Sequence, residues 1–295
     1  MRKKVFKRNV LSILTVVFAL FLCGCTGAKK DSNWIYGLII DDAWYESISK
    51  EDVIEGLKNL NHKPMVRIVM SKEMLAEDYI PLFKAATKYA DIMACPVDSS
   101  QMNQYKDVDS YVKRFKDAYK NLSPYVSVWE IGNEVNGIEW IKQDSALITE
   151  KISCAAKFIK NKGAKTELTL YCTDLPEKDM LQWVKKYISS EVTETMDYCF
   201  VSYYEDDNGG YQPDWDDIFD KLGKYFPSSL LGIGECGNTD KNATVASKTA
   251  RIKKYYGMKR VHERFVGGFF WWNWVEDCIP YEKNQLYELI NNYGY

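Results

Sequence analysis

The sequence predicts an α/β protein that folds as a single (β/α)8 TIM barrel, and three observations lead to that prediction. Short apolar runs recur eight times along the 295 residues, at intervals of about 30 to 40 residues. Stretches of helical periodicity lie between these runs, so that strand and helix alternate along the chain. The length that remains after an N-terminal leader is close to the roughly 250 residues that such a barrel needs.

The eight apolar runs are expected to be strands buried on both faces, as in a parallel sheet. They are residues 34–40, 65–70, 91–95, 126–131, 168–172, 198–203, 230–234 and 268–272. An open, doubly wound sheet is the alternative architecture. No G-x-G-x-x-G or G-x-x-x-x-G-K-[ST] string follows the first run, which removes the usual nucleotide-binding reason for such a sheet.

Amphipathic stretches between the runs are expected to form the outer helical layer. They are residues 50–59, 72–89, 108–121, 145–162, 177–189, 215–225 and 246–264. Ser49 and Asp109 are expected to cap helix N-termini, because their side-chain oxygens can accept hydrogen bonds from backbone N–H groups. Gly163 and Gly223 are suited to the ends of helices.

The first 25 residues read as a targeting segment. Residues 2–8 are basic, and the apolar run 10–22 that follows is too short to span a membrane comfortably. The run ends in Leu22-Cys23-Gly24-Cys25, which resembles the bacterial lipobox, where the cysteine is lipidated and becomes the new N-terminus. The resemblance implies a lipoprotein signal peptide over residues 1–24, a lipidated tether over residues 25–33 that begins at Cys25, and a barrel domain over residues 34–295.

This leader predicts a protein anchored by lipid to the bacterial cell membrane and facing the outside. An ordinary secretory signal cut nearby is the alternative. Six cysteines remain in the barrel domain, and most are expected to be free thiols because several lie in apolar runs. A disulfide between Cys236 and Cys278 is the alternative.

Composition argues against several classes of function. The net charge is −2 and no basic stripe is present, so nucleic acid is not an expected partner. No C-x-x-C pair and no cofactor motif occurs, so we expect neither a metal nor a cofactor. A monomer is expected.

Two glutamates stand where expected strands stop. Glu134 follows the fourth run in the string Glu130-Ile131-Gly132-Asn133-Glu134, and Glu235 follows the seventh in Gly234-Glu235-Cys236. The carboxyl ends of barrel strands carry the active site, and strands four and seven face each other across the mouth. Retaining glycosidases need two facing carboxyl groups about 5–5.5 Å apart. Burial would raise the pKa of an acid at position 134, while an arginine and a tyrosine would keep a nucleophile at position 235 ionised.

At these residues the chain resembles the large clan of retaining glycosidases that carry the acid/base after an asparagine on strand four and the nucleophile on strand seven. The resemblance implies that Asn133 binds the sugar 2-hydroxyl and that Arg67, on strand two, binds the nucleophile. It also implies a tyrosine on strand six that hydrogen-bonds the nucleophile, which is Tyr203 or Tyr204. A tryptophan on strand eight would form the floor under the sugar. Trp271 and Trp272 alternate faces, so only one can do so, and Trp272 is favoured.

Other interpretations of these residues stay open. Glu130 has the strand parity of Glu134 and is a possible structural partner of Arg67 inside the barrel. Asp41, together with Asp42 and Trp44, is either a sugar ligand or part of an exposed loop.

The chain also departs from the clan. Val135 stands where clan members often have proline, and the only histidines, His62 and His262, fall outside the strand ends. Cellulase-like families are therefore poor matches. The strings 131–136 and 202–204 resemble those of the endo-β-1,4-galactanases.

The sequence thus predicts a retaining glycoside hydrolase that cleaves β-glycosidic bonds by double displacement, endo-acting on an extracellular polysaccharide or oligosaccharide. The alternative is a catalytically inactive barrel that binds glycans as a surface lipoprotein. A third hypothesis, a structural adhesion lipoprotein, would make the pattern at the strand ends a coincidence.

Overall fold

The computed structural model describes residues 33–41 and 47–294. The predicted signal peptide, the lipidation of Cys25 and the tether up to residue 32 lie outside the described residues, as do Asp42 and Trp44. Within the described ranges, no helix combines the length and the apolar character that crossing a bilayer requires.

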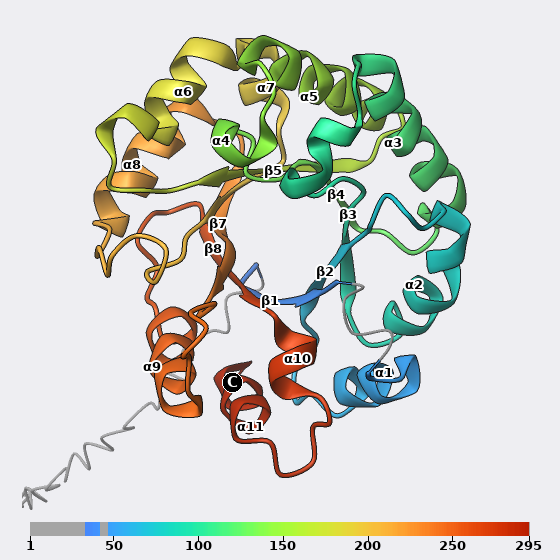
Figure 1. Cartoon of the computed structure of the whole chain (residues 1–295), viewed down its shortest axis with the longest axis vertical. Helices are drawn as coiled ribbons and strands as arrows, with labels where there is room; N and C mark the ends of the chain where they lie inside the picture. Colours follow the sequence, from blue (N-terminus) through green and yellow to red (C-terminus); the bar gives the residue numbers. More distant parts are fainter. Residues whose placement is uncertain (1–32, 42–46, 295) are drawn as a thin grey trace, which may run out of the picture. The chain divides into compact units, whose positions relative to one another are not determined.

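Eight parallel strands close into a barrel in chain order, with β8 pairing with β1 (Figure 1). The predicted (β/α)8 barrel is therefore confirmed. The strands are β1 (Ile35–Ile40), β2 (Met65–Val69), β3 (Asp91–Cys95), β4 (Val128–Gly132), β5 (Lys165–Tyr171), β6 (Tyr198–Ser202), β7 (Leu230–Gly237) and β8 (Phe265–Trp272).

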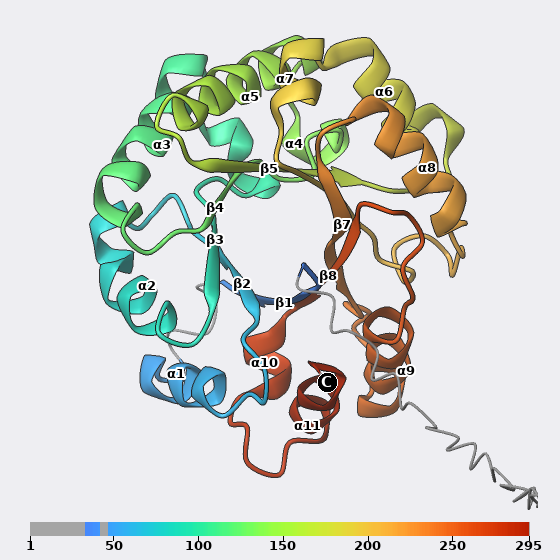
Figure 2. The same ribbon diagram turned by 180° about the vertical axis from the view of Figure 1, so that it is seen from behind.

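Helices surround the ring of strands in both views (Figures 1 and 2). The longer ones are α1 (Lys50–Lys58), α2 (Ile80–Ala86), α3 (Val108–Leu122), α5 (Ser145–Lys160), α6 (Met180–Tyr187), α8 (Trp215–Tyr225), α9 (Val245–Tyr256) and α11 (Gln285–Asn291). Shorter helical segments are α4 (Ile138–Ile141), α7 (Ser190–Thr195), α10 (Trp274–Cys278), η1 (Ala76–Tyr79), η2 (Ser99–Gln104), η3 (Pro176–Lys178) and η4 (Asn292–Gly294).

The C-terminal helices pack beside the first βα unit. Figures 1 and 2 both show α10 beside α1, with α11 on the other side of α10. Tyr287 of α11 donates its hydroxyl to the carbonyl of Gly56 in α1 at 2.8 Å. A Cβ on Gly56 would come within 2.5 Å of Ile279, so the glycine permits this close approach. The last elements of the chain thus cover the seam where the barrel closes.

One predicted helix cap is confirmed and one is wrong. Ser49 accepts a hydrogen bond from the N–H of Asp52 at 3.1 Å and caps α1. Asp109 lies inside the first turn of α3, and Asp107 is the cap instead. Its carboxylate accepts from the N–H of Ser110 at 2.7 Å, and the Ser110 hydroxyl accepts from the N–H of Asp107 at 3.4 Å. This reciprocal pair favours the earlier start.

The two glycines predicted at helix ends behave differently. Gly163 follows α5 with a φ of +71°, a conformation that glycine adopts without strain. Gly223 lies inside α8, so that prediction is wrong. A Cβ at Gly223 would meet the guanidinium of Arg264 at 2.8 Å, and that guanidinium donates to the Gly223 carbonyl at 2.6 Å. Close packing, and not chain termination, accounts for this glycine.

Several predicted boundaries also shift. The stretch 72–89 divides into η1 and α2, with Pro81 in the first turn of α2. The stretch 246–264 is helical only to Tyr256, where Gly257 follows. Strand β8 begins at Phe265, earlier than predicted, and contains Gly267 and Gly268 at φ of +83° and +96°. An apolar pattern alone does not predict a strand that contains glycines at positive φ.

The barrel interior contains an apolar cluster and a separate set of buried charges. The rings of Phe200 and Phe270 pack against each other in the interior, tilted by 39° with centroids 5.8 Å apart. Glycines make room for them, since a Cβ at Gly37 would lie 2.4 Å from the Phe270 ring and one at Gly234 would lie 2.7 Å from Phe200. Because the buried charged side chains are removed from water, they must be paired and hydrogen-bonded with one another.

The six cysteines in the described residues are all free. Five of them are buried and one is partly buried. The Cys236–Cys278 disulfide, which was the alternative, is not formed.

Candidate active site

A cavity of about 470 Å³ opens where the strands end, and we call it the mouth cavity. Its described lining comes from the carboxyl ends of β3 to β8 and the segments that follow them. The lining residues are Asp98, Ser99, Ser100, Asn133, Glu134, Trp140, Tyr171, Tyr204, Asp207, Glu235, Thr239 and Trp272. Both predicted catalytic glutamates therefore face the same cavity, at the end of the barrel where such sites occur.

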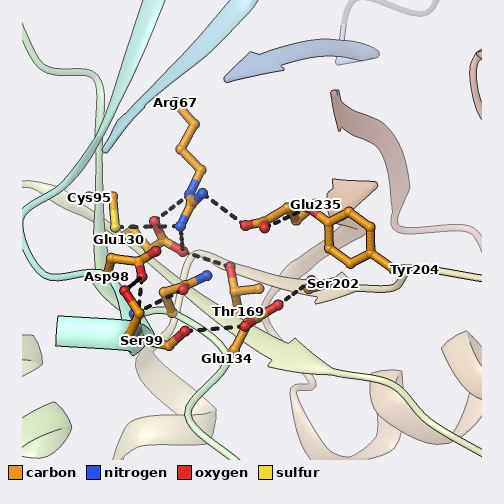
Figure 3. Close-up of polar contacts among 12 residues, drawn as sticks. Arg67, Cys95, Asp98, Ser99, Glu130, Glu134, Thr169, Ser202, Tyr204 and Glu235 are labelled. Carbon is orange, nitrogen blue, oxygen red and sulfur yellow. Dashed lines mark hydrogen bonds and ion pairs between the residues drawn. The ribbon is translucent and has the colours of Figure 1, made fainter. Parts of the chain in front are cut away.

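Glu235, near the end of β7, is held by one cation and one hydroxyl (Figure 3). Arg67 Nη1 donates to its Oε2 at 2.9 Å, and the Tyr204 hydroxyl donates to its Oε1 at 2.7 Å. The residue is 8% exposed, so both contacts lie largely out of water. Two fixed donors, one on each oxygen, orient this carboxylate.

Arg67 is shared between two carboxylates. Its Nε donates to Glu130 Oε2 at 2.6 Å and its Nη2 to Glu130 Oε1 at 3.2 Å, a two-point contact in addition to the one with Glu235. The Thr169 hydroxyl also contacts Glu130, at 2.9 Å. Both interpretations of Arg67 are thus realised, the ion pair inside the barrel and the contact with Glu235. Its side chain is fully buried and is not part of the mouth-cavity lining, so Arg67 reaches the site through its contact with Glu235.

Glu134 lies two residues beyond the end of β4 and is held by neutral hydroxyls. Ser202 Oγ donates to its Oε1 at 2.5 Å, and Ser99 Oγ donates to its Oε2 at 3.2 Å (Figure 3). Trp140 Nε1 in turn donates to Ser99 Oγ at 3.1 Å. The Glu134 backbone has a φ of +45°, a left-handed conformation that costs a non-glycine residue about 1 kcal/mol or more. The surrounding hydrogen bonds hold the residue in that conformation.

The pKa values of the two glutamates are both raised. Burial and, next, the charge of Glu235 raise the pKa of Glu134 to about 8, although the Ser202 hydrogen bond opposes the shift. Burial raises the pKa of Glu235 to about 7, while Arg67 and the Tyr204 hydroxyl lower it. The arginine and the tyrosine act in the expected direction on Glu235, but burial outweighs them. Glu134 is the carboxyl that holds its proton to the higher pH.

Asn133 carries a donor that no described residue uses. Its Oδ1 accepts from the N–H of Ser99 at 3.1 Å, which fixes the orientation of the amide. Its Nδ2 is buried and has no hydrogen-bond partner among the described residues. A buried amide N–H₂ without a partner is costly unless a ligand supplies the acceptor.

Of the two candidate tyrosines, Tyr204 faces the cavity and contacts Glu235. Tyr203 is fully buried on the helix side, where its hydroxyl donates to the Tyr211 carbonyl and its ring packs 5.6 Å from that of Trp215. Of the two alternatives, Tyr204 is the one that contacts Glu235, and Tyr203 lies outside the site. Adjacent strand residues point to opposite faces, and here only one of them points inward.

The two tryptophans divide in the same way. Trp272 lines the mouth cavity, as favoured from the sequence. Trp271 is fully buried, with its Nε1 donating to Asp277 at 2.9 Å, and it does not face the cavity. Asp41 is 8% exposed, accepts from Asn273 Nδ2 at 3.0 Å, and is not part of the described lining. The structure does not bring Trp271 or Asp41 to the site.

Several residues of the site were missed from the sequence. Ser99 and Ser202, which contact Glu134, are small hydroxyl residues without a motif, as is common in loops and at strand ends. A usable signal was the alternation along β6, because Phe200, Ser202 and Tyr204 share one face. Among the described residues, no group of three or more His, Cys, Asp or Glu is arranged to hold a metal ion.

No protein-family model matches the chain, and no curated protein matches it by sequence. Solved structures do match its fold. A glucosidase from Croceicoccus marinus aligns with a TM-score of 0.62 at 12% identity, over 88% of this chain and 67% of that one. A family 1 β-glucosidase from Thermotoga maritima gives 0.53 at 11% identity, over 82% and 88%. An endo-β-1,3-glucanase from Amycolatopsis mediterranei, solved with laminaritriose, gives 0.53 at 9% identity, over 88% and 98%. At these identities the likeness establishes the barrel fold.

Proposed function

We propose that this protein is a retaining glycoside hydrolase that cleaves β-glycosidic bonds, with Glu235 as nucleophile and Glu134 as acid/base. The observation that carries the proposal is one cavity lined by two glutamates with different partners. Glu235 is bound by Arg67 and Tyr204, whereas Glu134 is bound only by neutral hydroxyls. The first arrangement favours an ionised carboxylate and the second a protonated one, which is the division of roles that double displacement needs.

In the first step the Glu235 carboxylate attacks the anomeric carbon and forms a glycosyl ester. Glu134 gives its proton to the glycosidic oxygen, and the leaving sugar departs as an alcohol. In the second step Glu134, now ionised, takes a proton from water, and the resulting hydroxide displaces Glu235. The sugar is released with its original β configuration.

Other residues of the cavity support binding. The unused Asn133 Nδ2 is a donor for the sugar 2-hydroxyl, a contact that strengthens as the transition state forms. Trp272 offers an aromatic face for the sugar ring. Arg67 and Tyr204 act through Glu235 and are positioning residues.

The structural neighbours suggest where to begin the search for a substrate. Two are described as a glucosidase or β-glucosidase, and another as an endo-β-1,3-glucanase. Laminarin and mixed-linkage β-glucan are therefore the first polymers to test, and β-1,4-galactan is included because of the strings 131–136 and 202–204. Xylan and mannan complete the neutral panel.

The deciding experiment is hydrolysis of this panel and of aryl β-glycosides, with the first-formed product anomer followed by NMR. We expect a β product from the wild type and losses of several orders of magnitude for Glu134→Gln and Glu235→Gln, with unchanged circular dichroism. An α product would contradict the retaining mechanism. Glycan binding without turnover would support the inactive glycan-binding barrel instead.

We further propose that the chain is anchored through Cys25 on the outer side of a bacterial membrane, where a polymer too large for import is accessible. The proposal is supported by the lipobox-like string 22–25. Expression in a bacterial host should place the wild type in the membrane fraction and Cys25→Ser outside it. Equal fractionation of the two proteins would contradict lipidation at this residue.

A further inference from the structure

A second cavity of about 480 Å³ lies against the mouth cavity, and we call it the side cavity. Its lining comes from the segments after β4, β5 and β6 and from α6. Trp140, Tyr171 and Asp207 line both cavities, so the two spaces share a wall. The side cavity is therefore adjacent to the space that the two glutamates line.

The side cavity has the aromatic lining that a sugar chain would use. Trp140 and Tyr171 pack edge to face, with centroids 5.1 Å apart, and Trp183 and Tyr187 lie 5.5 Å apart. Leu175, on its rim, is 39% exposed, which is unusual for a large apolar side chain in this protein. The C–H faces of sugar rings pack on such surfaces, while their hydroxyls reach the polar groups between them.

The direction of the side cavity relative to the two glutamates decides which part of a glycan it would hold. Trp140 is one hydrogen bond from Ser99, whose hydroxyl donates to Glu134. Both glutamates line the mouth cavity alone, but Glu134 is the one that this chain of hydrogen bonds connects to a residue shared with the side cavity. The side cavity therefore extends from the Glu134 side. An acid that protonates the departing oxygen stands beside the leaving group, so the leaving group lies on this side.

The charges that line the two cavities disfavour acidic sugars. The charged side chains in the described mouth-cavity lining are all carboxylic acids: Asp98, Glu134, Asp207 and Glu235. The side cavity is lined by four carboxyl side chains and two lysines, Lys178 and Lys186, and Lys178 is paired with Glu139 at 2.7 Å, so its lining is negative on balance. Like charges brought together across an interface cost several kcal/mol. Uronic acid residues are thus disfavoured, and neutral sugars fit.

We propose that the side cavity binds the leaving-group sugars of a neutral β-glycan. This inference rests on the proposed hydrolase activity and adds the place and the chemistry of its aglycone subsites. Tyr187, which lines only the side cavity, is the residue that tests it.

The experiment compares Tyr187→Ala with Tyr225→Ala on three substrates. Tyr187 and Tyr225 are both partly buried final residues of outer helices, α6 and α8, so the second variant controls for loss of helix packing. The substrates are the neutral polymer of the panel that the wild type hydrolyses fastest, its reducing-end-labelled oligosaccharides, and the matching aryl β-glycoside. The aryl group leaves without needing aglycone sugar subsites.

For Tyr187→Ala we expect kcat/KM on the polymer to fall about tenfold and on the aryl glycoside to change less than about twofold. Cleavage of the labelled oligosaccharides should shift toward the reducing end, since fewer units are held on the leaving side. Tyr187→Phe, which keeps the ring, should restore the wild-type pattern. Tyr225→Ala should match the wild type on all three substrates.

Three results would overturn the inference while leaving the hydrolase intact: equal losses on polymer and aryl glycoside, a shift of cleavage toward the non-reducing end, or faster hydrolysis of β-1,4-linked polymannuronate than of any neutral polymer. Absence of turnover on every substrate, aryl glycosides included, would instead overturn the proposed function and the inference with it.

Discussion

The two sides of the mouth cavity hold their glutamates in different ways. On the β7 side, Glu235 contacts a guanidinium and a phenol, and the guanidinium is fixed by a second carboxylate, Glu130. On the β4 side, Glu134 contacts two serine hydroxyls and stands on a strained backbone. Both carboxyls are removed from water, which raises both pKa values. The difference between them therefore comes from the partners: a charge on one side and neutral dipoles on the other.

The largest expected effect separates the roles of the two glutamates by the stereochemistry of rescue. Glu235→Ala and Glu134→Ala should each lower hydrolysis of aryl β-glycosides by about 10³-fold or more. Azide should restore both variants, because it fits the space that each carboxylate vacates. With Glu235→Ala it attacks directly and gives an α-glycosyl azide, whereas with Glu134→Ala it displaces the glycosyl ester and gives a β-glycosyl azide. NMR of the products checks this, and the same anomer from both variants would contradict the assignment.

The next effect tests the phenol that contacts Glu235. Tyr204→Phe should lower kcat/KM about tenfold or more and move the acid limb of the pH profile to higher pH, because a hydrogen bond that lowers the pKa of Glu235 is lost. Tyr203→Phe is the matched control. It removes the hydrogen bond to the Tyr211 carbonyl and should cost about 1 kcal/mol of folding stability. Its pH profile should stay that of the wild type. Equal shifts of the acid limb in both variants would contradict the specific role of Tyr204.

A smaller effect concerns the hydroxyls that contact Glu134. Catalysis needs Glu235 ionised and Glu134 protonated, so the kcat/KM profile should be a narrow bell between pH values of about 7 and about 8. The Ser202 hydrogen bond lowers the pKa of Glu134, so Ser202→Ala should move only the alkaline limb, to higher pH. The loss at the optimum should be severalfold. A shift of the acid limb instead would mean that the two glutamates have the opposite roles.

The smallest effect is on stability. The folded-state pKa of Glu134 lies above its unfolded value of about 4.5, so the unfolded chain releases this proton first as the pH rises. The contribution of the protonated Glu134 to folding stability is therefore fully present below pH 4.5 and is lost as the pH rises toward 8. Glu134→Gln, which stays neutral, should melt a few degrees above the wild type at pH 8 and at the same temperature at pH 4.

Glu235→Gln is the matched variant in the same melting experiment. It also removes a carboxyl with a raised pKa, but it leaves the Arg67 guanidinium with one charged partner fewer. We therefore expect a smaller gain at pH 8 than for Glu134→Gln, or a loss. An equal gain for both variants would mean that Arg67 contributes nothing specific on the β7 side.

The architecture was predictable because it depends on average properties of segments. Eight buried strands need eight apolar runs. The number and order of these runs can be predicted correctly even when each boundary is wrong by a few residues. The boundaries were less predictable where one contact decides them. Gly223 resembles a helix terminator but accommodates Arg264, and Asp107, not Asp109, begins α3 because it pairs with Ser110.

The site was predictable as far as strand ends determine it. Glu134, Glu235 and Asn133 reach the cavity because each lies at the end of its strand or just beyond. The alternation along β6 shows that Tyr203 and Tyr204 face opposite ways, but which one faces inward depends on strand pairing in the closed barrel. The register of that pairing shifts between Val201 and Ser202, and no local sequence pattern predicts this irregularity. The side cavity was missed because it is built from segments between the strands.

The left-handed backbone at Glu134 has an evolutionary consequence. Glycine and asparagine adopt this conformation more readily than glutamate, so the backbone and the chemistry favour different residues at this position. Selection for turnover would keep the glutamate against that preference. In a lineage in which turnover no longer mattered, position 134 would be expected to drift toward glycine or asparagine before the barrel itself changed, so this single position would record the loss of activity.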